Sequence, residues 1–471
     1  MRKLFYKHAT LYTLSSLLTK GISVLLVPLY TRFLSPRDYG LLDLVLATCT
    51  LVNLTIALEI HQAIARFYHE WTAEERRRHV STATYFAGGV YTAFALGFLL
   101  WAGPLLERGA DVGLEPGVVP AGSALIWTSG IFYILQSQLR WGVKANDYVA
   151  SSVLFSVVTG VVTPALLVTH RGGVVDMLVG LAAGNAAGLA FCLWRGRQNH
   201  GARFSGKRLA RMLGFSAPLV LSSLAAFATL YMDRFIILSR LTLDDLGLFS
   251  LATKFSSVTG IALVGVNSAL TPLIYQHHRD AETRGQVETI LEKYVLLASA
   301  IVLGALWFSE EALLVLTTGP FLGARSLVPP LVLASLIAGM YNFFPGLSIA
   351  KRTRAIAVIN VAAMGVNFAA TSMLVHWMGI LGAAVAAVAV AAFVTGLYFL
   401  LGRADYPVAV APRVMAGALA VLAASWGARA LVPAAASGAP LAAKVAFCAM
   451  GLGALYLLGR ATRSARPSPA A

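Results

Sequence analysis

Seven ionisable side chains lie within or beside long apolar runs of this sequence. Four are cations and three are carboxylates: Lys20, Arg66, Arg234 and Lys254, then Asp43, Glu59 and Asp233. A charge at the centre of a bilayer costs about 3 kcal/mol or more, so such residues face protein or water and mark the paths of substrates, ions or protons. The sequence therefore predicts a polar path through an otherwise apolar protein.

Lys20 lies near the middle of the first apolar run. At roughly 100° per residue, Thr13, Ser16 and Thr31 lie within about 40° of it on a helix, so this helix has one polar face. We expect that face to line an aqueous cavity. The alternative is a structural pair between Lys20 and a buried carboxylate.

The second apolar run carries charges on two faces. On a straight helix Asp43 shares one face with Thr50 and His61, whereas Glu59 and Arg66 share the opposite face. Either Glu59 contacts a neighbouring helix as a structural pair with Arg66, or the helix bends. The straight-helix geometry favours the structural pair.

Asp233 and Arg234 are adjacent in the seventh apolar run. Neighbouring side chains project roughly 100° apart on a helix, so we expect that these two do not simply neutralise each other. Arg234 shares its face with Ser216 and Ser223. The alternative is that both charged side chains reach the outer membrane interface.

The sequence repeats itself at an offset of 207 residues. The matching segments are Leu34–Leu42 with Leu241–Phe249, Lys144 with Lys351, and the packing ladder Gly180, Gly184 and Gly188 with Ala387, Ala391 and Thr395. A duplicated bundle of membrane helices is the usual construction of a secondary transporter, with the substrate path between the repeats.

The same offset relates two of the charged residues. It places Asp43 on Ser250 and Lys254 on Ala47, and residues four apart share a helix face. Asp43 and Lys254 are therefore predicted to face one cavity from the two halves of the protein. They would form a gate, a proton-linked ion pair or a static bridge between the halves.

The elements that must position these residues are membrane-spanning helices. The sequence is 58% hydrophobic and 12% charged, with a mean hydropathy of +0.73, which excludes a soluble fold. Its apolar runs have the length of about 20 residues that a helix needs to cross a bilayer. We predict an all-α polytopic membrane protein with about fourteen spans: 9–31, 39–64, 81–102, 118–138, 147–169, 174–194, 214–238, 246–275, 294–308, 326–348, 355–376, 379–401, 414–428 and 441–459.

The net charge of +16 comes from Lys and Arg that gather in every second loop. This is the positive-inside pattern, which predicts that both termini are cytoplasmic and argues against a nucleic-acid partner.

The segment Gly201–Lys207 has the spacing of a phosphate-binding loop, but Arg208 stands where a Ser or Thr is needed, so no nucleotide site is predicted. No metal-site spacing occurs, so we expect no metal and no cofactor. The tail 461–471 is predicted to be disordered.

Three segments together resemble a known family. They are Gly21–Gly40, Phe215–Val220 leading to Asp233-Arg234-Phe235, and Ala350–Arg354 leading to Gly379–Ala384. They are similar to bacterial polysaccharide-biosynthesis membrane proteins, the O-antigen and exopolysaccharide flippases of the MOP (multidrug/oligosaccharidyl-lipid/polysaccharide) superfamily. Arg66 and the Asp233-Arg234 pair lie where the family often has like residues, whereas the surroundings of Glu59 differ.

The resemblance implies two pseudo-symmetric six-helix lobes, 1–200 and 201–405, around a central cavity, followed by two extra helices in 406–460. It implies a transporter of the bacterial inner membrane, not an enzyme, whose substrate is an undecaprenyl-pyrophosphate-linked oligosaccharide. Lys20, Arg66, Arg234 and Lys254 would then meet the pyrophosphate, and Asp43, Glu59 and Asp233 would serve in coupling to H⁺ or Na⁺ or in gating. Membrane lipids and a polysaccharide polymerase are the further partners implied.

The residues also bear on three alternatives to this function. A drug or metabolite antiporter of the same superfamily usually carries cations, and the cations Lys20, Arg234 and Lys254 argue against it. A lipid II flippase also carries an anionic lipid, so the sequence does not exclude this function. A membrane-embedded polymerase or ligase is disfavoured, because the outer loops Gly103–Gly117 and Ser309–Arg325 are short for a catalytic site.

Overall fold

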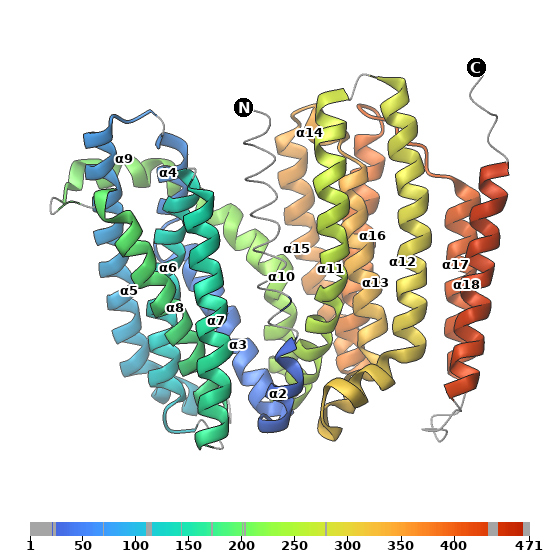
Figure 1. The fold of residues 1–471 in the computed structure, drawn as a ribbon, viewed down its shortest axis with the longest axis horizontal. Coiled ribbons are helices and arrows are strands. Elements are labelled where there is room, and N and C mark those ends of the chain that lie inside the picture. The colour runs from blue at the N-terminus through green and yellow to red at the C-terminus, as the bar shows by residue number, and fades with distance from the viewer. Residues whose placement is uncertain are drawn as a thin grey trace. The chain divides into compact units, whose positions relative to one another are not determined.

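The computed structural model describes the chain outside residues 1–20, 22–24, 69, 110–114, 143, 171–172, 200, 202–203, 278–279, 432–440 and 465–471. All regular elements of the described chain are helices (Figure 1). Lys20, most of the predicted span 9–31 and most of the predicted disordered tail lie outside the described residues.

The chain forms two compact units. The N-terminal unit extends to Arg234 and also includes Thr242–Gly247, and the C-terminal unit is formed by Phe235–Leu241 and the chain from Leu248 onward. The predicted lobe boundaries, 1–200, 201–405 and 406–460, stay a prediction.

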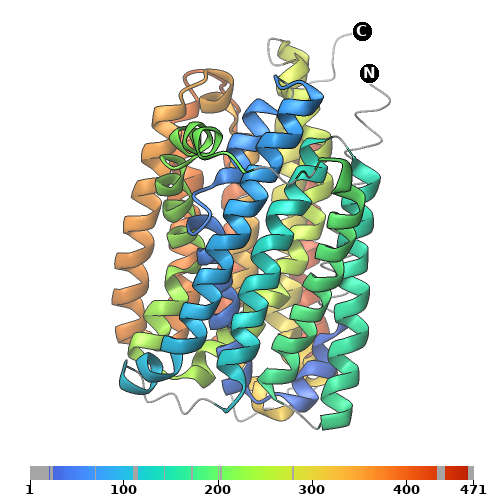
Figure 2. The ribbon, with the colours of Figure 1, turned by 90° about the vertical axis from the view of Figure 1, so that its left-hand side faces the viewer.

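The N-terminal unit is built from long helices that run side by side (Figures 1 and 2). Helix α8 packs against both α6 and α7, and α5 packs against α6. On α8, a Cβ added to Gly180 would lie 2.1 Å from Thr163 of α7, so the ladder lets the helices pack closely. In chain order, the described helices that begin in the N-terminal unit are α2 (Val27–Phe33), α3 (Pro36–Thr55), α4 (Ile60–Phe67), α5 (Ala73–Gly109), α6 (Val118–Trp141), α7 (Ala145–His170), α8 (Val174–Gly196), the short 3-10 helix η1 (Arg197–Asn199), α9 (Gly206–Ser216) and α10 (Leu219–Arg240). The next helix, α11, also begins in this unit.

The first matching segment of the 207-residue repeat starts a helix in both copies. At the start of α3, the Asp38 N–H donates to Ser35 Oγ and the Ser35 N–H donates to Asp38 Oδ2, at 3.2 and 2.8 Å. At the start of α11 (Leu243–His277), Thr242 and Asp245 form the same two hydrogen bonds. Each is a capping box, which satisfies backbone N–H groups that a helix start leaves without partners.

The two helix starts lie against each other in the N-terminal unit. A Cβ added to Gly40 would lie 2.1 Å from the carbonyl oxygen of Leu243, and one added to Gly247 would lie 1.8 Å from that of Pro36. Pro36 and Leu243 are equivalent in the repeat, as are Gly40 and Gly247. The contact is therefore locally symmetric, and it requires glycine on both sides because backbone meets backbone.

The C-terminal unit is also a helical bundle. Helix α16 packs against α13 and α15, and α12 packs against α13, α17 and α18. Most of its elements are α11, α12 (Ala281–Leu316), α13 (Val328–Met340), α14 (Gly346–Ile349), α15 (Thr353–Met378), α16 (Ile380–Gly402), α17 (Pro412–Leu431) and α18 (Leu441–Ser464), with the 3-10 helices η2 (Gly319–Ser326) and η3 (Tyr341–Phe343).

A charged cluster joins α17 and α18 to α12. Glu310 of α12 lies 3.3 Å from Nζ of Lys444 in α18, 3.6 Å from Nη2 of Arg429 in α17 and 3.0 Å from Nη1 of Arg325 in η2. Lys444 also pairs with Glu311 and is only 4% exposed. These ion pairs fasten the last two helices at one end of the unit.

Ten helices of the described chain are long and apolar enough to cross a membrane, and the bent pair α3–α4 makes eleven. The ten are Ala73–Trp101, Val118–Trp141, Ala145–His170, Val174–Gly196, Leu219–Arg240, Glu282–Leu316, Val328–Ile349, Thr353–Met378, Ile380–Gly402 and Leu441–Arg460. The predicted spans 246–275 and 414–428 fall in α11 and α17, which are not among the ten.

Candidate functional site

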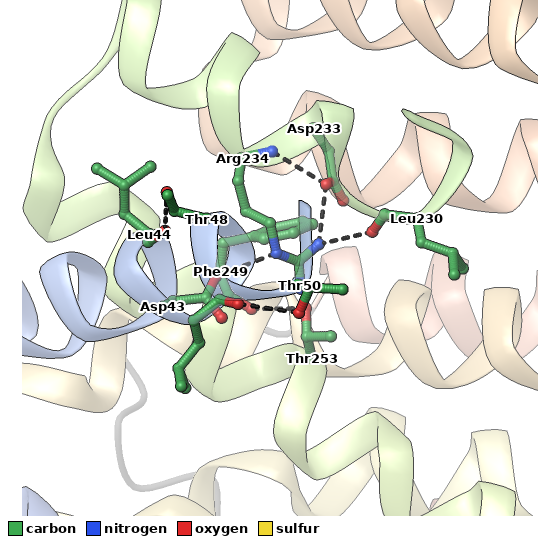
Figure 3. Close-up of polar contacts among 10 residues, drawn as sticks. Asp43, Leu44, Thr48, Thr50, Leu230, Asp233, Arg234, Phe249 and Thr253 are labelled. Atoms are coloured by element: carbon green, nitrogen blue, oxygen red, sulfur yellow. Dashed lines mark hydrogen bonds and ion pairs between the residues drawn. The ribbon is translucent and has the colours of Figure 1, made fainter. Parts of the chain in front are cut away.

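Helix α10 places Arg234 between two carboxylates of the N-terminal unit. Its Nε lies 3.1 Å from Oδ2 of Asp43 on α3, and its Nη1 lies 2.8 Å from Oδ1 of Asp233 (Figure 3). Arg234 is 7% exposed, so these interactions take place away from water. Charge-assisted hydrogen bonds of this kind are among the strongest that proteins make.

The expectation that Asp233 and Arg234 do not neutralise each other is wrong. The Arg234 guanidinium turns back along α10, where Nη1 donates to the Leu230 carbonyl at 3.0 Å as well as to Asp233. Its Cζ lies 4.9 Å from the ring centroid of Tyr231. The angle between adjacent Cβ positions did not exclude the pair, because the long arginine side chain can bend back over one helical turn.

The second predicted span bends at Glu59. Helices α3 and α4 meet at 49°, and Leu58 and Glu59 between them have φ angles of 48° and 53°. Both residues are therefore in the left-handed region, which costs about 1–2 kcal/mol for each residue with a Cβ. The bend is the less favoured of the two alternatives that the sequence left open.

The favoured alternative, a structural pair between Glu59 and Arg66, is wrong. Arg66 pairs with Glu70, and both of these side chains are more than half exposed. Glu59 instead accepts a hydrogen bond from the hydroxyl of Ser223 on α10. The left-handed residues end the regular helix, so the straight-helix faces no longer apply beyond Leu58.

Glu59 belongs to a buried polar group that also includes a histidine and a tyrosine. Its Oε2 lies 3.3 Å from Nδ1 of His61, and Nε2 of His61 lies 3.1 Å from the hydroxyl of Tyr133 on α6. Glu59 and His61 are 2% and 5% exposed. The sequence placed His61 on the helix face of Asp43 and did not predict Tyr133, since nothing local marks a tyrosine 72 residues away as its partner.

Two polar contacts thus join α10 to the second predicted span. Ser223 contacts Glu59 and Arg234 contacts Asp43, and the shared face of Ser223 and Arg234 was predicted from the sequence. Eleven residues of helix separate them, or about 16 Å. We call these five residues, Asp43, Glu59, Ser223, Asp233 and Arg234, the α10 seam.

The remaining predicted site residues lie elsewhere. Lys254 is half-buried on α11 in the C-terminal unit, so its predicted pairing with Asp43 in the N-terminal unit stays a prediction. Arg66 lies in the last turn of α4, beside Glu70. Within the described chain, no group of three or more His, Cys, Asp or Glu side chains is arranged to hold a metal ion.

The sequence of residues 5–278, more than half of the chain, matches the family described as polysaccharide biosynthesis protein. The chain therefore belongs to this family, which confirms the resemblance. A protein of the Lsg locus of Haemophilus influenzae is 23% identical over 337 residues, which cover 68% of this chain and 78% of that protein.

Two solved structures show the same fold. The lipid II flippase MurJ in an inward closed conformation is 12% identical, has a TM-score of 0.72, and is matched over 96% of this chain and 98% of its own. An inward-facing multidrug resistance MATE transporter of the MOP superfamily is 16% identical, with a TM-score of 0.62 and coverage of 87% and 95%. The predicted fold class is confirmed, and the chain is a multi-pass membrane protein with the fold of MOP-superfamily transporters.

Proposed function

We propose that this protein is a flippase that moves an undecaprenyl-pyrophosphate-linked oligosaccharide from the cytoplasmic to the periplasmic leaflet of the bacterial inner membrane. It would work by alternating access, coupled to an ion gradient, and would supply a polymerase in surface polysaccharide biosynthesis. Membership of the polysaccharide biosynthesis family supports the pathway. The observation that carries the proposal is the buried Arg234, which is held between two carboxylates inside this fold.

Arg234 is suited to bind a pyrophosphate. A guanidinium presents several N–H donors in a planar fork, which matches the oxygens of a phosphate group. Asp43 and Asp233 now occupy two of these donors. A pyrophosphate must therefore compete with the two carboxylates, and protonation of either carboxylate would favour the cargo. Lys20, Arg66 and Lys254 are proposed as further contacts of the anionic head group.

An apolar cavity of the C-terminal unit supports a cargo with a lipid chain. It has a volume of about 220 Å³ and lies between α12, α13, α16 and α17. Its walls are almost wholly apolar, with Val302, Leu336, Met415 and Leu419 among the lining residues. Such a surface matches a hydrocarbon chain and offers a sugar few hydrogen-bonding partners.

The proposal is tested by reconstituting the purified protein in liposomes with a fluorescent undecaprenyl-pyrophosphate oligosaccharide. Arg234→Gln should slow its translocation at least about tenfold, because hydrogen bonds to a charged group contribute roughly 1.5–3 kcal/mol. Arg240→Gln on the same helix is the control, since Arg240 is exposed, and should translocate at the wild-type rate.

The same liposomes separate the alternatives. A lipid II flippase would translocate lipid II and leave the oligosaccharide lipid behind, and a drug antiporter would move a cationic dye against a proton or sodium gradient. Either result, or an unchanged rate in Arg234→Gln, would overturn the proposed cargo or the role of Arg234.

A further inference from the structure

Glu59 and His61 place a carboxylate and an imidazole against each other where α3 ends and α4 begins. Glu59 Oε2 and His61 Nδ1 are 3.3 Å apart, and both atoms are buried without a hydrogen-bond partner. A buried polar atom without a partner costs about 1–3 kcal/mol. A neutral imidazole protonated at Nδ1 could donate to Oε2, but it would leave the negative charge of the carboxylate buried, whereas one added proton would remove that charge.

The other polar atoms of the pair are held from two different helices. Ser223 of α10 donates its hydroxyl to Oε1 of Glu59, and the hydroxyl of Tyr133 on α6 lies 3.1 Å from Nε2 of His61. These contacts fix the carboxylate and the ring from their far sides. Oε2 of Glu59 and Nδ1 of His61 are left 3.3 Å apart between these contacts.

The backbone break is what brings the two side chains together. Residues two apart on a continuous helix point in nearly opposite directions, so Glu59 and His61 could not meet there. The left-handed conformation of Leu58 and Glu59 makes the contact possible. Strained residues of this kind persist where the surrounding structure enforces them, and they cluster at functional sites.

The charge of the pair depends on a single proton. Without it, a carboxylate and a neutral imidazole leave one negative charge buried, and with it the pair is neutral. The other ionisable groups that act on the pair are Tyr133 and Arg140 of α6 and Tyr91 of α5, and Gln62 of α4 is a polar neighbour. The tyrosines are uncharged near neutral pH, so Arg140 is the only fixed charge among these neighbours.

We propose that Glu59 and His61 together bind one exchangeable proton. The proton enters from water and is held between Oε2 and Nδ1, either as a carboxylic acid beside a neutral imidazole or as a carboxylate beside an imidazolium. It returns to water when the pair is unloaded. A role of this proton as the coupling ion rests on the flippase function proposed above, whereas proton binding itself does not.

The test uses the purified full-length protein in lipid nanodiscs without cargo. Infrared difference spectra are recorded as the pH is changed, and they follow the carboxyl and imidazole bands. The wild type should show a one-proton titration that disappears in Glu59→Gln. In His61→Gln its midpoint should move by at least about one pH unit, a differential interaction that is typical of a close partner.

Two further variants keep the test sharp. Tyr133→Phe keeps the ring and removes only the hydroxyl, so it should shift the midpoint of the same titration. It replaces Glu59→Gln as the test if that variant does not fold. Glu70→Gln is the control, because Glu70 is an exposed glutamate paired with Arg66, and it should leave the titration of the pair unchanged.

The outcomes separate this proposal from the flippase function. A titration unaffected by Glu59→Gln or by His61→Gln would overturn the proton site. A normal titration in a protein that moves no oligosaccharide lipid would support the proton site and overturn only the cargo. Full proton-driven flipping by Glu59→Gln would overturn its coupling role.

Discussion

The guanidinium of Arg234 lies 3.1 Å from the carboxylate of Asp43, although the two residues are 191 positions apart in the chain. The same guanidinium also pairs with Asp233 of α10. One cation therefore joins α10 to α3 and also interacts with a carboxylate on its own helix. Binding of an anionic cargo to Arg234 would have to change both contacts. The α10 seam is therefore the first place to test for a link between cargo and conformation.

The Arg234 contacts predict a large loss of stability when the cation is removed. Arg234→Gln leaves the half-buried carboxylates of Asp43 and Asp233 without their shared guanidinium, which should cost up to roughly 3–5 kcal/mol of unfolding free energy. Arg234→Lys should lie between this variant and the wild type, because an ammonium lacks the planar fork. Thermal unfolding of the purified protein in detergent measures both.

A double variant tests whether the partners act as one unit. Asp43→Asn combined with Arg234→Gln removes a charge from each side, so it should cost less than the sum of the two single changes. If the costs simply add, the pair seen in the structure does not contribute through direct interaction.

The backbone at Leu58 predicts opposite effects of glycine at two neighbouring positions. Leu58→Gly removes a Cβ from a left-handed residue and should relieve about 1–2 kcal/mol of strain. Leu54→Gly makes the same change within helix α3 and should cost about 1 kcal/mol through helix propensity. The two half-buried leucines are otherwise comparable, so Leu58→Gly should unfold at the higher temperature. The reverse order would mean that the break carries no strain.

The contact between Gly40 and Gly247 predicts that alanine is harmful at both positions. Each new Cβ would overlap the partner's backbone, and overpacking of this kind typically costs about 1–3 kcal/mol. Because the contact is symmetric, the two variants should be similarly destabilised in thermal unfolding. Gly97→Ala in α5 is the control, since a Cβ there meets no atom within 4 Å. An equal melting temperature in all three variants would contradict the close approach.

The charged cluster of the C-terminal unit predicts how α17 and α18 are held. Lys444→Met leaves Glu310 and Glu311 without their buried ammonium, so hydrogen exchange in α17 and α18 should rise by at least about tenfold, as expected for a loss of more than 1.4 kcal/mol. Arg460→Met at the exposed end of α18 should leave exchange unchanged. Equal exchange in the two variants would show that apolar packing alone fastens these helices.

The sequence by itself determined the features that depend on neighbouring residues. Apolar runs of membrane length became helices, because a helix satisfies its own backbone in hydrocarbon. The repeated segments at Ser35 and Thr242 became the same capping box, since both hydrogen bonds of that box form within four residues. Helical periodicity placed Ser223 and Arg234 on one face, and both contact the second predicted span, whereas Ser216 lies in the separate helix α9.

Only the tertiary structure decided which charges meet. No Gly or Pro lies near Leu58 and Glu59 to indicate a break in the helix, so the break depends on the packing around these residues. That break moved Glu59 away from Arg66 and toward Ser223 and His61, and the fold brought Asp43 to Arg234. Contacts between distant segments depend on how whole helices pack and on where the backbone leaves the regular helix, and neither property is encoded in the local pattern of residues.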